Sequence, residues 1–451
     1  MTVGGVDSQG RDATNDLSYL FLEALERTEV VVDLSARWSR QSPQEYRRTV
    51  MRVVRKGLGR PSVFNDDVTI EAIARTGIDI EDARDYAPLG CVEVMIPGRS
   101  AFRTMGFGLN LLKVLELTLN EGRCLVTGEQ VWPDVPSSFE SFENFVSEFH
   151  AREKAVIDLG VEIIKEDERI EASVAPQPWL TVLSRGGIED ALDLTAGQPK
   201  YDPVGVTLHG LADVANSLCA IKRLVFEERR LSLDELRRML RDNWAGHETM
   251  RQRVIHQLPR FGQDKPEINA IIAEEARHYA QCFKPHRTHF GGPFWPMIFG
   301  VSTSLIFGHA PQTGATPSGR RRGETIAQSL QPCAAGPQGC ATEILRSIGE
   351  IDYLDFPGGI SNVQDCDPSL AQGPEGLERL QCLFEGFFAL GGMELYINFL
   401  GEEKLREAQA DPDRHRYLMV RLFGLSAQFV NLSPAVQESV IERVRAAAQR
   451  R

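Results

Sequence analysis

Cys91 and Glu93 stand two residues apart in the segment Gly90-Cys91-Val92-Glu93. On extended backbone, residues at this spacing point to the same side, so the segment would offer a thiol and a carboxylate to one pocket. There the carboxylate can serve as a general base and the thiol as a nucleophile or a radical carrier. The pattern also fits a buried cysteine beside a solvent-facing glutamate, and it leaves these two interpretations open.

A second segment of chemical interest is an apolar run near the C-terminus with one glycine, Gly424, at its centre. The run reads Val420-Arg421-Leu422-Phe423-Gly424-Leu425-Ser426-Ala427. Glycine inside a strand pattern usually marks a bulge or a close approach of two backbones. Taken by itself, the run therefore needs only a structural explanation.

The common catalytic and metal-binding motifs do not occur in the sequence. It contains no Walker A loop, no His-Glu-x-x-His, no Gly-x-Ser-x-Gly and no Gly-x-Gly-x-x-Gly. The eight cysteines include no Cys-x-x-Cys pair, and neither His286 nor His289 has a neighbouring carboxylate or cysteine to complete a zinc site. We therefore predict a structural role for these two histidines, no bound metal, and reduced thiols in a cytoplasmic protein.

The charge balance disfavours nucleic acid and membrane surfaces as partners. Asp plus Glu number 63 against 50 Lys plus Arg, which gives a net charge of −13 and an acidic surface that repels phosphate groups. The N-terminal residues lack the basic and apolar regions of a signal peptide. The stretch between Arg287 and Arg320 is free of Asp, Glu, Lys and Arg but is interrupted by Pro296 and Gly300. We predict that it forms buried core rather than a membrane span.

Helical patterns recur along the chain and must position these segments. Apolar spacing predicts helices over 111–118 and 211–225. Ser-x-x-Glu capping boxes predict helix starts at Ser137 and Ser232, and a serine followed by proline predicts another at Ser433.

Short apolar runs between the helices suit buried strands. They cover residues 29–33, 395–399 and 418–422. Helices that alternate with such runs predict an α/β fold.

The two chemical segments belong to an ordered series that resembles the glycyl radical enzymes, the family that includes pyruvate formate-lyase and several dehydratases. The resemblance covers residues 1 to about 447. It rests on residues 4–7, 59–61 with 65–66, 82–86, 90–93, 113–117, 220–225, 314–317 with 319–321, 362–368 and the segment around Gly424. Each segment is weak alone, but the ordered series is specific.

The resemblance implies a radical relay between Gly424 and Cys91. A Cα radical stored on Gly424 would take hydrogen from the thiol of Cys91, and the resulting thiyl would abstract hydrogen from a small substrate. Glycine suits this role because, without a side chain, its radical centre can flatten and delocalise over the flanking amides. Glu93 matches the general base of the members that eliminate a neighbouring group.

The implied reaction is that of a dehydratase or another lyase. An arylacetate-type decarboxylase is the alternative within the family, as is a member similar to formate acetyltransferase. The latter is disfavoured because pyruvate formate-lyase has two adjacent cysteines, whereas position 90 here is glycine.

The resemblance further implies partners rather than bound cofactors. A separate activating enzyme, which is an iron–sulfur protein dependent on S-adenosylmethionine, would install the radical on Gly424, and a homodimer is compatible with the family. Such a radical reacts with oxygen, so the enzyme would work anaerobically. Reaction with oxygen at Gly424 would cleave the chain and release residues 425–451.

The implied fold is a ten-stranded α/β barrel made of two five-stranded halves, of which this chain would supply the C-terminal half. Residues 1–310 would form part of the barrel domain, with the cysteine loop near 88–98, and residues 311–451 the glycine radical domain. Three explanations for the missing half stay open. The sequence could be truncated, the other half could be supplied by a second chain, or this chain could be a remnant of a longer enzyme.

Residues beside the glycine motivate a hypothesis from another class. The family pattern has a small residue before the glycine and a tyrosine after it, whereas this chain has Phe423 and Leu425. The chain could thus be a non-catalytic relative that acts as a binding or scaffold protein. A hydrolase with Cys91 as nucleophile is a third hypothesis, which would require a histidine close to that thiol.

Two groups of residues remain candidates for substrate contacts. Arg99, Arg103 and Met105 follow the cysteine segment and could face its pocket or serve ordinary packing. The arginine run 320–322 could bind phosphate, but a solvated turn is the favoured interpretation.

Overall fold

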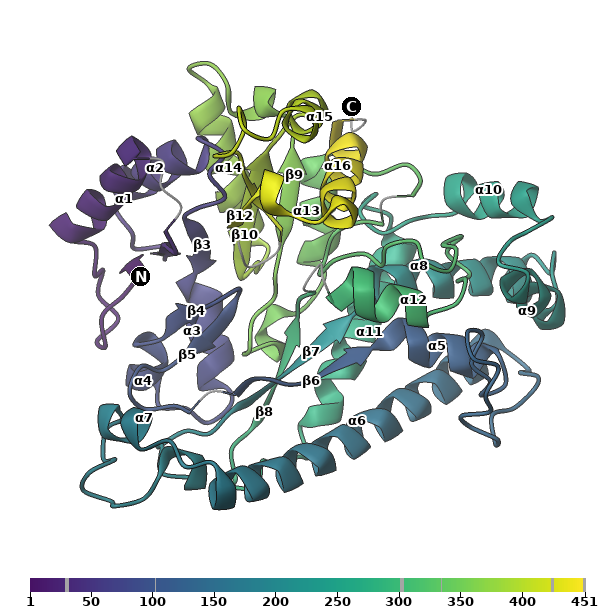
Figure 1. The fold of residues 1–451 in the computed structure, drawn as a ribbon, viewed down its shortest axis with the longest axis horizontal. Coiled ribbons are helices and arrows are strands. Elements are labelled where there is room, and N and C mark those ends of the chain that lie inside the picture. Colours follow the sequence, from purple (N-terminus) through teal and green to yellow (C-terminus); the bar gives the residue numbers. More distant parts are fainter. Residues whose placement is uncertain (29–31, 102, 301–303, 334, 423–425, 449–451) are drawn as a thin grey trace.

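The computed structural model describes residues 1–28, 32–101, 103–300, 304–333, 335–422 and 426–448. In these ranges, helices alternate with short strands and surround two sheets, as the sequence predicts for an α/β chain (Figure 1). The remaining strands in these ranges form two small hairpins.

The larger sheet has five strands and joins the two ends of the chain. Its order is β1 (Thr2–Gly4), β2 (Ser35–Trp38), β3 (Ser62–Asn65), β10 (Glu394–Phe399) and β9 (Val363–Cys366). Neighbouring strands are parallel, except that β3 and β10 are antiparallel. The segment beyond residue 310 therefore completes a sheet that the N-terminal segment begins.

The smaller sheet is parallel and has three strands in the order β6 (Arg103–Asn110), β7 (Val204–His209) and β8 (Phe294–Ile298). A parallel bridge between Ile298 and Ile360 links β8 to the segment that leads into β9. The bridge thus connects the β8 edge of the smaller sheet to the segment before the β9 edge of the larger one. Every residue of β7 and β8 is buried, as expected for parallel strands covered on both faces.

The helices connect these strands and cover them. The described α-helices are α1 (Asp16–Thr28), α2 (Gln44–Val54), α3 (Asp66–Ala74), α4 (Ile80–Arg84), α5 (Leu111–Leu119), α6 (Phe142–Val174), α7 (Pro178–Leu183), α8 (Leu211–Ile221), α9 (Leu233–Arg241), α10 (Glu248–Gln257), α11 (Pro266–Phe283), α12 (Ala310–Gln312), α13 (Ala341–Gly349), α14 (Gly376–Ala389), α15 (Glu402–Ala410) and α16 (Pro434–Ala448). The long helix α6 runs beneath β6, β7 and β8 in the view of Figure 1 and contacts β6, whereas α11 contacts both α6 and β8. Within the described ranges, none of the helices combines the length and the apolar character needed to cross a bilayer.

Two hairpins carry the chemical segments of the sequence. The first pairs β4 (Ala87–Leu89) with β5 (Glu93–Met95), and the second pairs β11 (Met419–Arg421) with β12 (Ser426–Gln428). Both are antiparallel and form separate two-stranded sheets.

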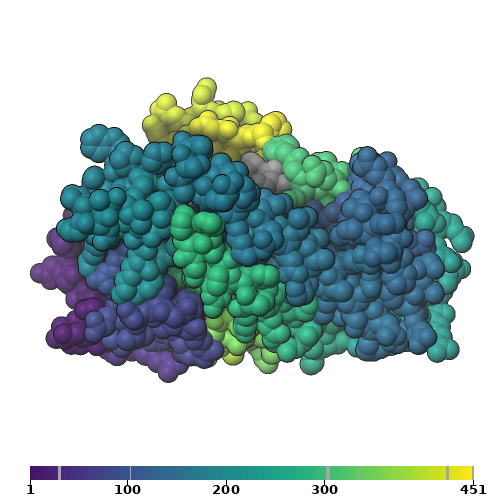
Figure 2. Space-filling model, turned by 90° about the horizontal axis from the view of Figure 1, so that it is seen from below, coloured from purple at the N-terminus to yellow at the C-terminus, as the bar shows by residue number. Residues whose placement is uncertain are grey.

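The C-terminal segment has an apolar cluster of its own beside the main core. The cluster combines residues of α15, the second hairpin and α16, among them Leu405, Val420, Val440 and Ile441. Figure 2 shows this C-terminal segment, in yellow, raised above the blue and teal segments.

Most of the predicted elements are confirmed. Helices span Leu111–Leu119 and Leu211–Ile221, and α16 starts at Pro434 directly after Ser433. Ser232 forms the predicted capping box, in which its side chain and that of Glu235 bond each other's backbone N–H groups. The predicted strands at 395–399 and 418–422 correspond to β10 and β11.

One prediction of local structure is wrong, and a second falls mostly outside the described residues. Helix α6 does not start at the capping-box spacing of Ser137, because Ser141 caps it instead by accepting a hydrogen bond from the N–H of Asn144. Of the strand predicted at 29–33, residues 29–31 lie outside the described residues and the last two are not in a strand. The strand of this region is β2, whose buried residues lie a few positions later.

The predicted division into residues 1–310 and 311–451 stays a prediction. Strands β1–β3 of the N-terminal part and β9–β10 of the C-terminal part belong to one sheet. The two parts therefore pack together wherever the domain boundary falls.

Candidate active site

Cys91 lies in the turn of the first hairpin, between β4 and β5, and is half-buried. The turn starts at Gly90, whose φ of 58° is in the left-handed region that glycine adopts without strain. The expectation that Cys91 and Glu93 share an extended strand is therefore wrong, since only Glu93 is in β5. The two residues are nevertheless brought together, because the turn folds back on the strand.

The Glu93 carboxylate holds this turn in shape. Its Oε2 accepts hydrogen bonds of 2.8 Å from the backbone N–H groups of Cys91 and Val92. The Glu93 side chain is buried, and this desolvation raises the pKa of the carboxyl above its usual value. The alternative of a solvent-facing glutamate is thereby corrected, because these two N–H groups draw the carboxylate inward. Burial and a raised pKa suit a group that exchanges protons.

Tyr396 on β10 fixes the same turn from the larger sheet. Its hydroxyl donates a hydrogen bond of 2.6 Å to the backbone oxygen of Cys91. The guanidinium of Arg421, on β11 of the second hairpin, lies 4.1 Å from the centre of the Tyr396 ring, a distance typical of a cation–π contact. The cysteine turn and the second hairpin are thus connected through one buried tyrosine.

Gly424 and its neighbours Phe423 and Leu425 lie outside the described residues. The strands on either side are described, and Arg421 at the end of β11 pairs with Ser426 at the start of β12. Cys91 packs against the C-terminal cluster that includes Val420 and Leu422. The hairpin whose connection contains Gly424 is therefore anchored beside the cysteine turn.

Sequence reasoning missed a buried glutamate beside this site. Glu394 opens β10 two residues before Tyr396, and its side chain is fully buried. Among the described residues, neither of its carboxylate oxygens has a hydrogen-bond partner, and desolvation raises the pKa of Glu394 well above its usual value. The sequence did contain a signal for this residue, because Glu394 directly precedes residues 395–399, which were predicted to form a buried strand.

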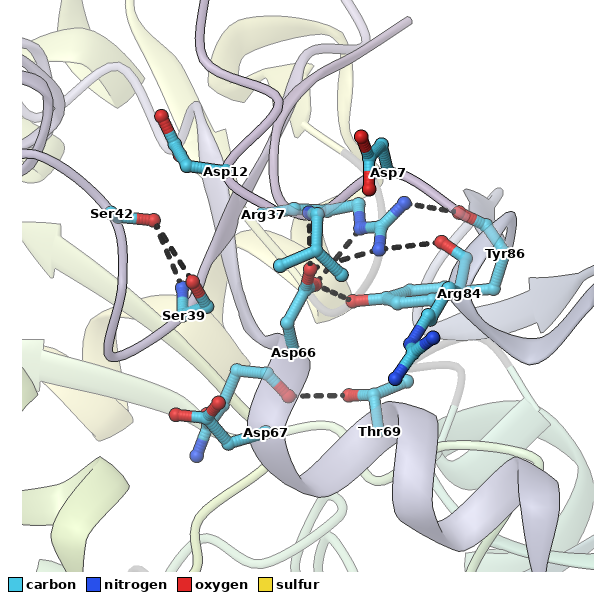
Figure 3. Close-up of polar contacts among 12 residues, drawn as sticks. Asp7, Asp12, Arg37, Ser39, Ser42, Asp66, Asp67, Thr69, Arg84 and Tyr86 are labelled. Carbon is cyan, nitrogen blue, oxygen red and sulfur yellow. Dashed lines mark hydrogen bonds and ion pairs between the residues drawn. The ribbon is translucent and has the colours of Figure 1, made fainter. Parts of the chain in front are cut away.

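A buried ion-pair network supports the base of the cysteine hairpin (Figure 3). Both Asp66 carboxylate oxygens accept hydrogen bonds of 2.8 Å from the Arg37 guanidinium, and Oδ1 also accepts one of 2.7 Å from the Tyr86 hydroxyl. Arg37 further donates to the backbone oxygens of Arg84 and Tyr86, the residues that lead into β4. The network ties the hairpin to β2 and α3, which belong to the framework of the larger sheet.

The arginines that follow the cysteine segment have structural partners. Arg99 forms an ion pair with the buried Asp82, and Arg103 forms ion pairs with Asp167 and Glu171. Met105 is an exposed side chain. Ion pairing, part of one of the two interpretations left open, accounts for the two arginines, and Met105 is an ordinary surface residue.

The prediction that Arg320 lies in a solvated turn is wrong. It is buried and donates hydrogen bonds to the backbone oxygens of Gly314, Ala310 and Glu324. It therefore closes the loop that contains it. The flanking Arg321 pairs with Glu248 at the surface, so both side chains have partners other than phosphate.

The structural role predicted for the two clustered histidines has a side-chain contact behind it at His286 and stays a prediction for the ring of His289. His286 pairs with Asp158 at 2.9 Å, and the backbone N–H of His289 donates to Glu168.

Replacing Tyr396 by phenylalanine tests whether the tyrosine positions the cysteine turn. We expect a loss of about 1–2 kcal/mol in the free energy of unfolding, because the Cys91 carbonyl loses its donor. Turnover, wherever it can be measured, should slow as the turn loosens. The matched control is Tyr279→Phe, which removes a 2.7 Å bond to the backbone oxygen of Val206 in the smaller sheet. Equal effects of both variants on turnover would contradict a positioning role for Tyr396.

Comparison with known proteins yields one consistent family. Residues 1–308 match the family described as pyruvate formate lyase-like, and residues 327–430 match the one described as glycine radical. The (2S)-3-sulfopropanediol dehydratase of Klebsiella oxytoca is 29 % identical over 456 residues, which cover 98 % of this chain and 54 % of the relative. The trans-4-hydroxy-L-proline dehydratase of Clostridioides difficile is 28 % identical, and the matched region covers 98 % of this chain and 56 % of the dehydratase.

Solved structures agree with the sequence comparison. The glycerol-bound form of the B12-independent glycerol dehydratase from Clostridium butyricum has a TM-score of 0.93 and 30 % identity, and covers 98 % of this chain. This chain corresponds to 56 % of that structure and thus spans about half the length of the relatives it matches. The match confirms the predicted barrel fold.

Proposed function

The chain belongs to the pyruvate formate lyase-like family of glycyl radical enzymes, and we propose that it acts as a dehydratase or related lyase on a small substrate. One observation carries this proposal: the turn with Cys91 and Glu93 packs beside the hairpin whose connection contains Gly424. The dehydratases among its relatives support the reaction class.

The proposed relay starts with a radical on the Cα of Gly424. This centre takes the hydrogen atom of the Cys91 thiol and leaves a thiyl radical, which abstracts a hydrogen atom from a carbon of the substrate. The bond between sulfur and hydrogen is weak enough for this exchange to run in both directions, so Cys91 can return the atom to the product. The apolar neighbours of Cys91 support the proposal because they shield a reactive thiyl.

Glu93 is proposed as the base that accepts a proton from the substrate hydroxyl next to the radical carbon. Removal of this proton assists loss of the neighbouring group. Both backbone bonds to the carboxylate go to Oε2, so we assign Oε1 to the substrate. The raised pKa supports this role because it makes the carboxylate a better proton acceptor.

The partners expected from the resemblance belong to the same proposal. A separate radical S-adenosylmethionine enzyme would install the radical on Gly424, and the active protein would work in the cytoplasm, free of oxygen. A cytoplasmic location is supported by the cysteines, none of which forms a disulfide in the part of the chain that the structure describes.

Electron paramagnetic resonance tests the proposed radical directly. The chain should be incubated without oxygen with an activating enzyme and S-adenosylmethionine, both alone and with a polypeptide that supplies the unmatched part of the glycerol dehydratase. We expect a glycine-centred doublet that is absent from the Gly424→Ala variant. A folded wild-type chain without a doublet in either arrangement would favour the non-catalytic scaffold instead.

The Glu93→Gln variant tests the proposed base. The amide oxygen can still accept both backbone hydrogen bonds, so the turn should persist while turnover falls by about 10²–10⁴-fold. Because the pKa of Glu93 is raised, wild-type turnover should fall as the pH drops through that raised pKa and the carboxylate becomes protonated. The Gln variant should lack this pH limb. An unchanged rate in Glu93→Gln would remove the carboxylate from the mechanism.

A further inference from the structure

Two histidines and two glutamates meet where α6 packs on α11, away from the cysteine turn. His150 and Glu153 are one turn apart on α6, and Glu275 and His278 have the same spacing on α11. Residues three apart lie on one face of a helix, so each helix presents a histidine and a glutamate to its neighbour. The radical chemistry proposed above makes no use of these four side chains.

The four side chains are arranged as two crossed pairs. The Nδ1 of His278 lies 2.7 Å from Oε2 of Glu153, and the Nε2 of His150 lies 3.1 Å from both carboxylate oxygens of Glu275. The two imidazole rings stack in parallel with their centres 3.7 Å apart. One nitrogen of each ring and one oxygen of Glu153 fall within 4.8 Å of one another.

Glu153 carries a polar atom that nothing in the described part of the chain satisfies. Its side chain is fully buried, and its Oε1 has no hydrogen-bond partner among the described residues. Burying a carboxylate is costly unless it is paired or binds a metal, and Glu275 adds a second buried carboxylate to the cluster. A metal ion binds imidazole in its neutral form, so one divalent cation bound here would balance the charges of two carboxylates.

We propose that His150, Glu153 and His278 bind a divalent first-row transition metal ion, with zinc as the expected occupant. Imidazole nitrogen with carboxylate oxygen is a donor set for such ions, whereas calcium and magnesium prefer oxygen alone. Metal–ligand bonds of about 2.0–2.1 Å place the ligands of a tetrahedral ion roughly 3.3 Å apart. The His278 and Glu153 atoms are now 2.7 Å apart, and all three ligand atoms lie within 4.8 Å of one another. Because an imidazole binds a metal in its ring plane, one of the two stacked rings would turn on binding.

Glu275 is assigned a positioning role. It faces His150 and would orient that ring, as carboxylates commonly do for metal-bound histidines. Both histidines reach the surface in part, with 16 % and 22 % of their side chains exposed, so an ion can enter from solvent. A water molecule would complete the coordination.

The ion would act as a clamp between α6 and α11. These helices contact β6 and β8, the outer strands of the smaller sheet, so an ion that joins them stabilises the layer behind that sheet. Metal binding would then add to the stability of the folded chain, since a preformed site rarely exists in an unfolded one. This role is independent of the proposed radical reaction and can be tested without measuring turnover.

The test uses the 451-residue chain, stripped of metal and titrated with Zn²⁺ against a chromophoric chelator. We expect one equivalent to bind and to raise the Tm. Glu153→Gln and His278→Gln should weaken binding by at least about 100-fold, and Glu275→Gln by about 10-fold. His286→Gln is the matched control, because it breaks a histidine–carboxylate pair with Asp158 on α6 for which the described residues offer no third ligand. It should bind Zn²⁺ as the wild type does.

Absence of stoichiometric binding to the folded wild type would overturn the proposal. Binding that persists unchanged in folded Glu153→Gln and His278→Gln would also overturn it, because the ion would then lie elsewhere. X-ray absorption of the wild type loaded with Zn²⁺ decides the matter even if these variants do not fold. Two imidazoles with oxygen donors support the site, and any other donor set, such as several sulfurs or oxygen alone, contradicts it.

Discussion

The Cys91→Ala variant is expected to keep the radical signal of Gly424 and to lose turnover altogether. If the thiol only passes hydrogen between Gly424 and the substrate, its removal interrupts the relay after the radical has formed. The loss should be at least about 10³-fold, because the variant has no other group to carry the covalent step. Alanine at this position keeps the backbone N–H that bonds Glu93 and the backbone oxygen that bonds Tyr396.

The measurement pairs electron paramagnetic resonance with an anaerobic turnover assay on the same activated sample. A candidate vicinal diol or hydroxylated amino acid is the assay substrate, chosen for the dehydratases among the relatives. Cys340→Ala is the matched control, because this half-buried cysteine caps α13 and lies outside the proposed site. Turnover by activated Cys91→Ala at a rate near that of the wild type would refute the thiyl step.

The second large effect is expected on stability, at the network beneath the cysteine hairpin. In Asp66→Asn, the guanidinium of Arg37 loses its bidentate partner but stays buried. Removal of one member of a buried ion pair typically costs about 3–5 kcal/mol, because the remaining charge is neither paired nor solvated. We expect a loss of this size in the free energy of unfolding, measured by urea denaturation followed by circular dichroism.

Two comparisons make this result specific. Glu71→Gln breaks the exposed pair with Arg75 and should cost less than about 1 kcal/mol. The double variant Arg37→Met with Asp66→Leu should recover much of the lost stability, since apolar replacement of a whole buried pair is often neutral. An Asp66→Asn variant as stable as the wild type would show that the network does not support the hairpin.

The histidines show how far sequence reasoning reaches. The pair His286 and His289 drew attention because the two are close in sequence, and the structure gives His286 a structural partner in Asp158. The cluster at α6 and α11 was not found, because His278 lies 125 residues from its partner Glu153. Spacing along the chain reports ligands on one helix, but it carries no information on which helix packs opposite.

The cysteine segment shows a different limit. Its residues were identified from the sequence, yet the carboxylate of Glu93 was expected either in a shared pocket or in solvent. In the structure it turns back onto the N–H groups of Cys91 and Val92. That direction depends on the turn opened by Gly90 and on the tyrosine from β10, which the local pattern does not contain.

The sequence by itself determined the α/β class, the family, the helix starts at Ser232 and Ser433, and the identities of Cys91, Glu93 and Gly424 as the residues to consider. Apolar periods, caps and ordered motifs are local, so they can be read along one chain. Only the tertiary structure decided that the cysteine turn packs beside the second hairpin, that Tyr396 joins the two, and that α6 and α11 bring two histidines and two glutamates together. Those contacts depend on which distant surfaces bury each other, because the free energy gained by burial depends on the whole packed chain rather than on any one segment.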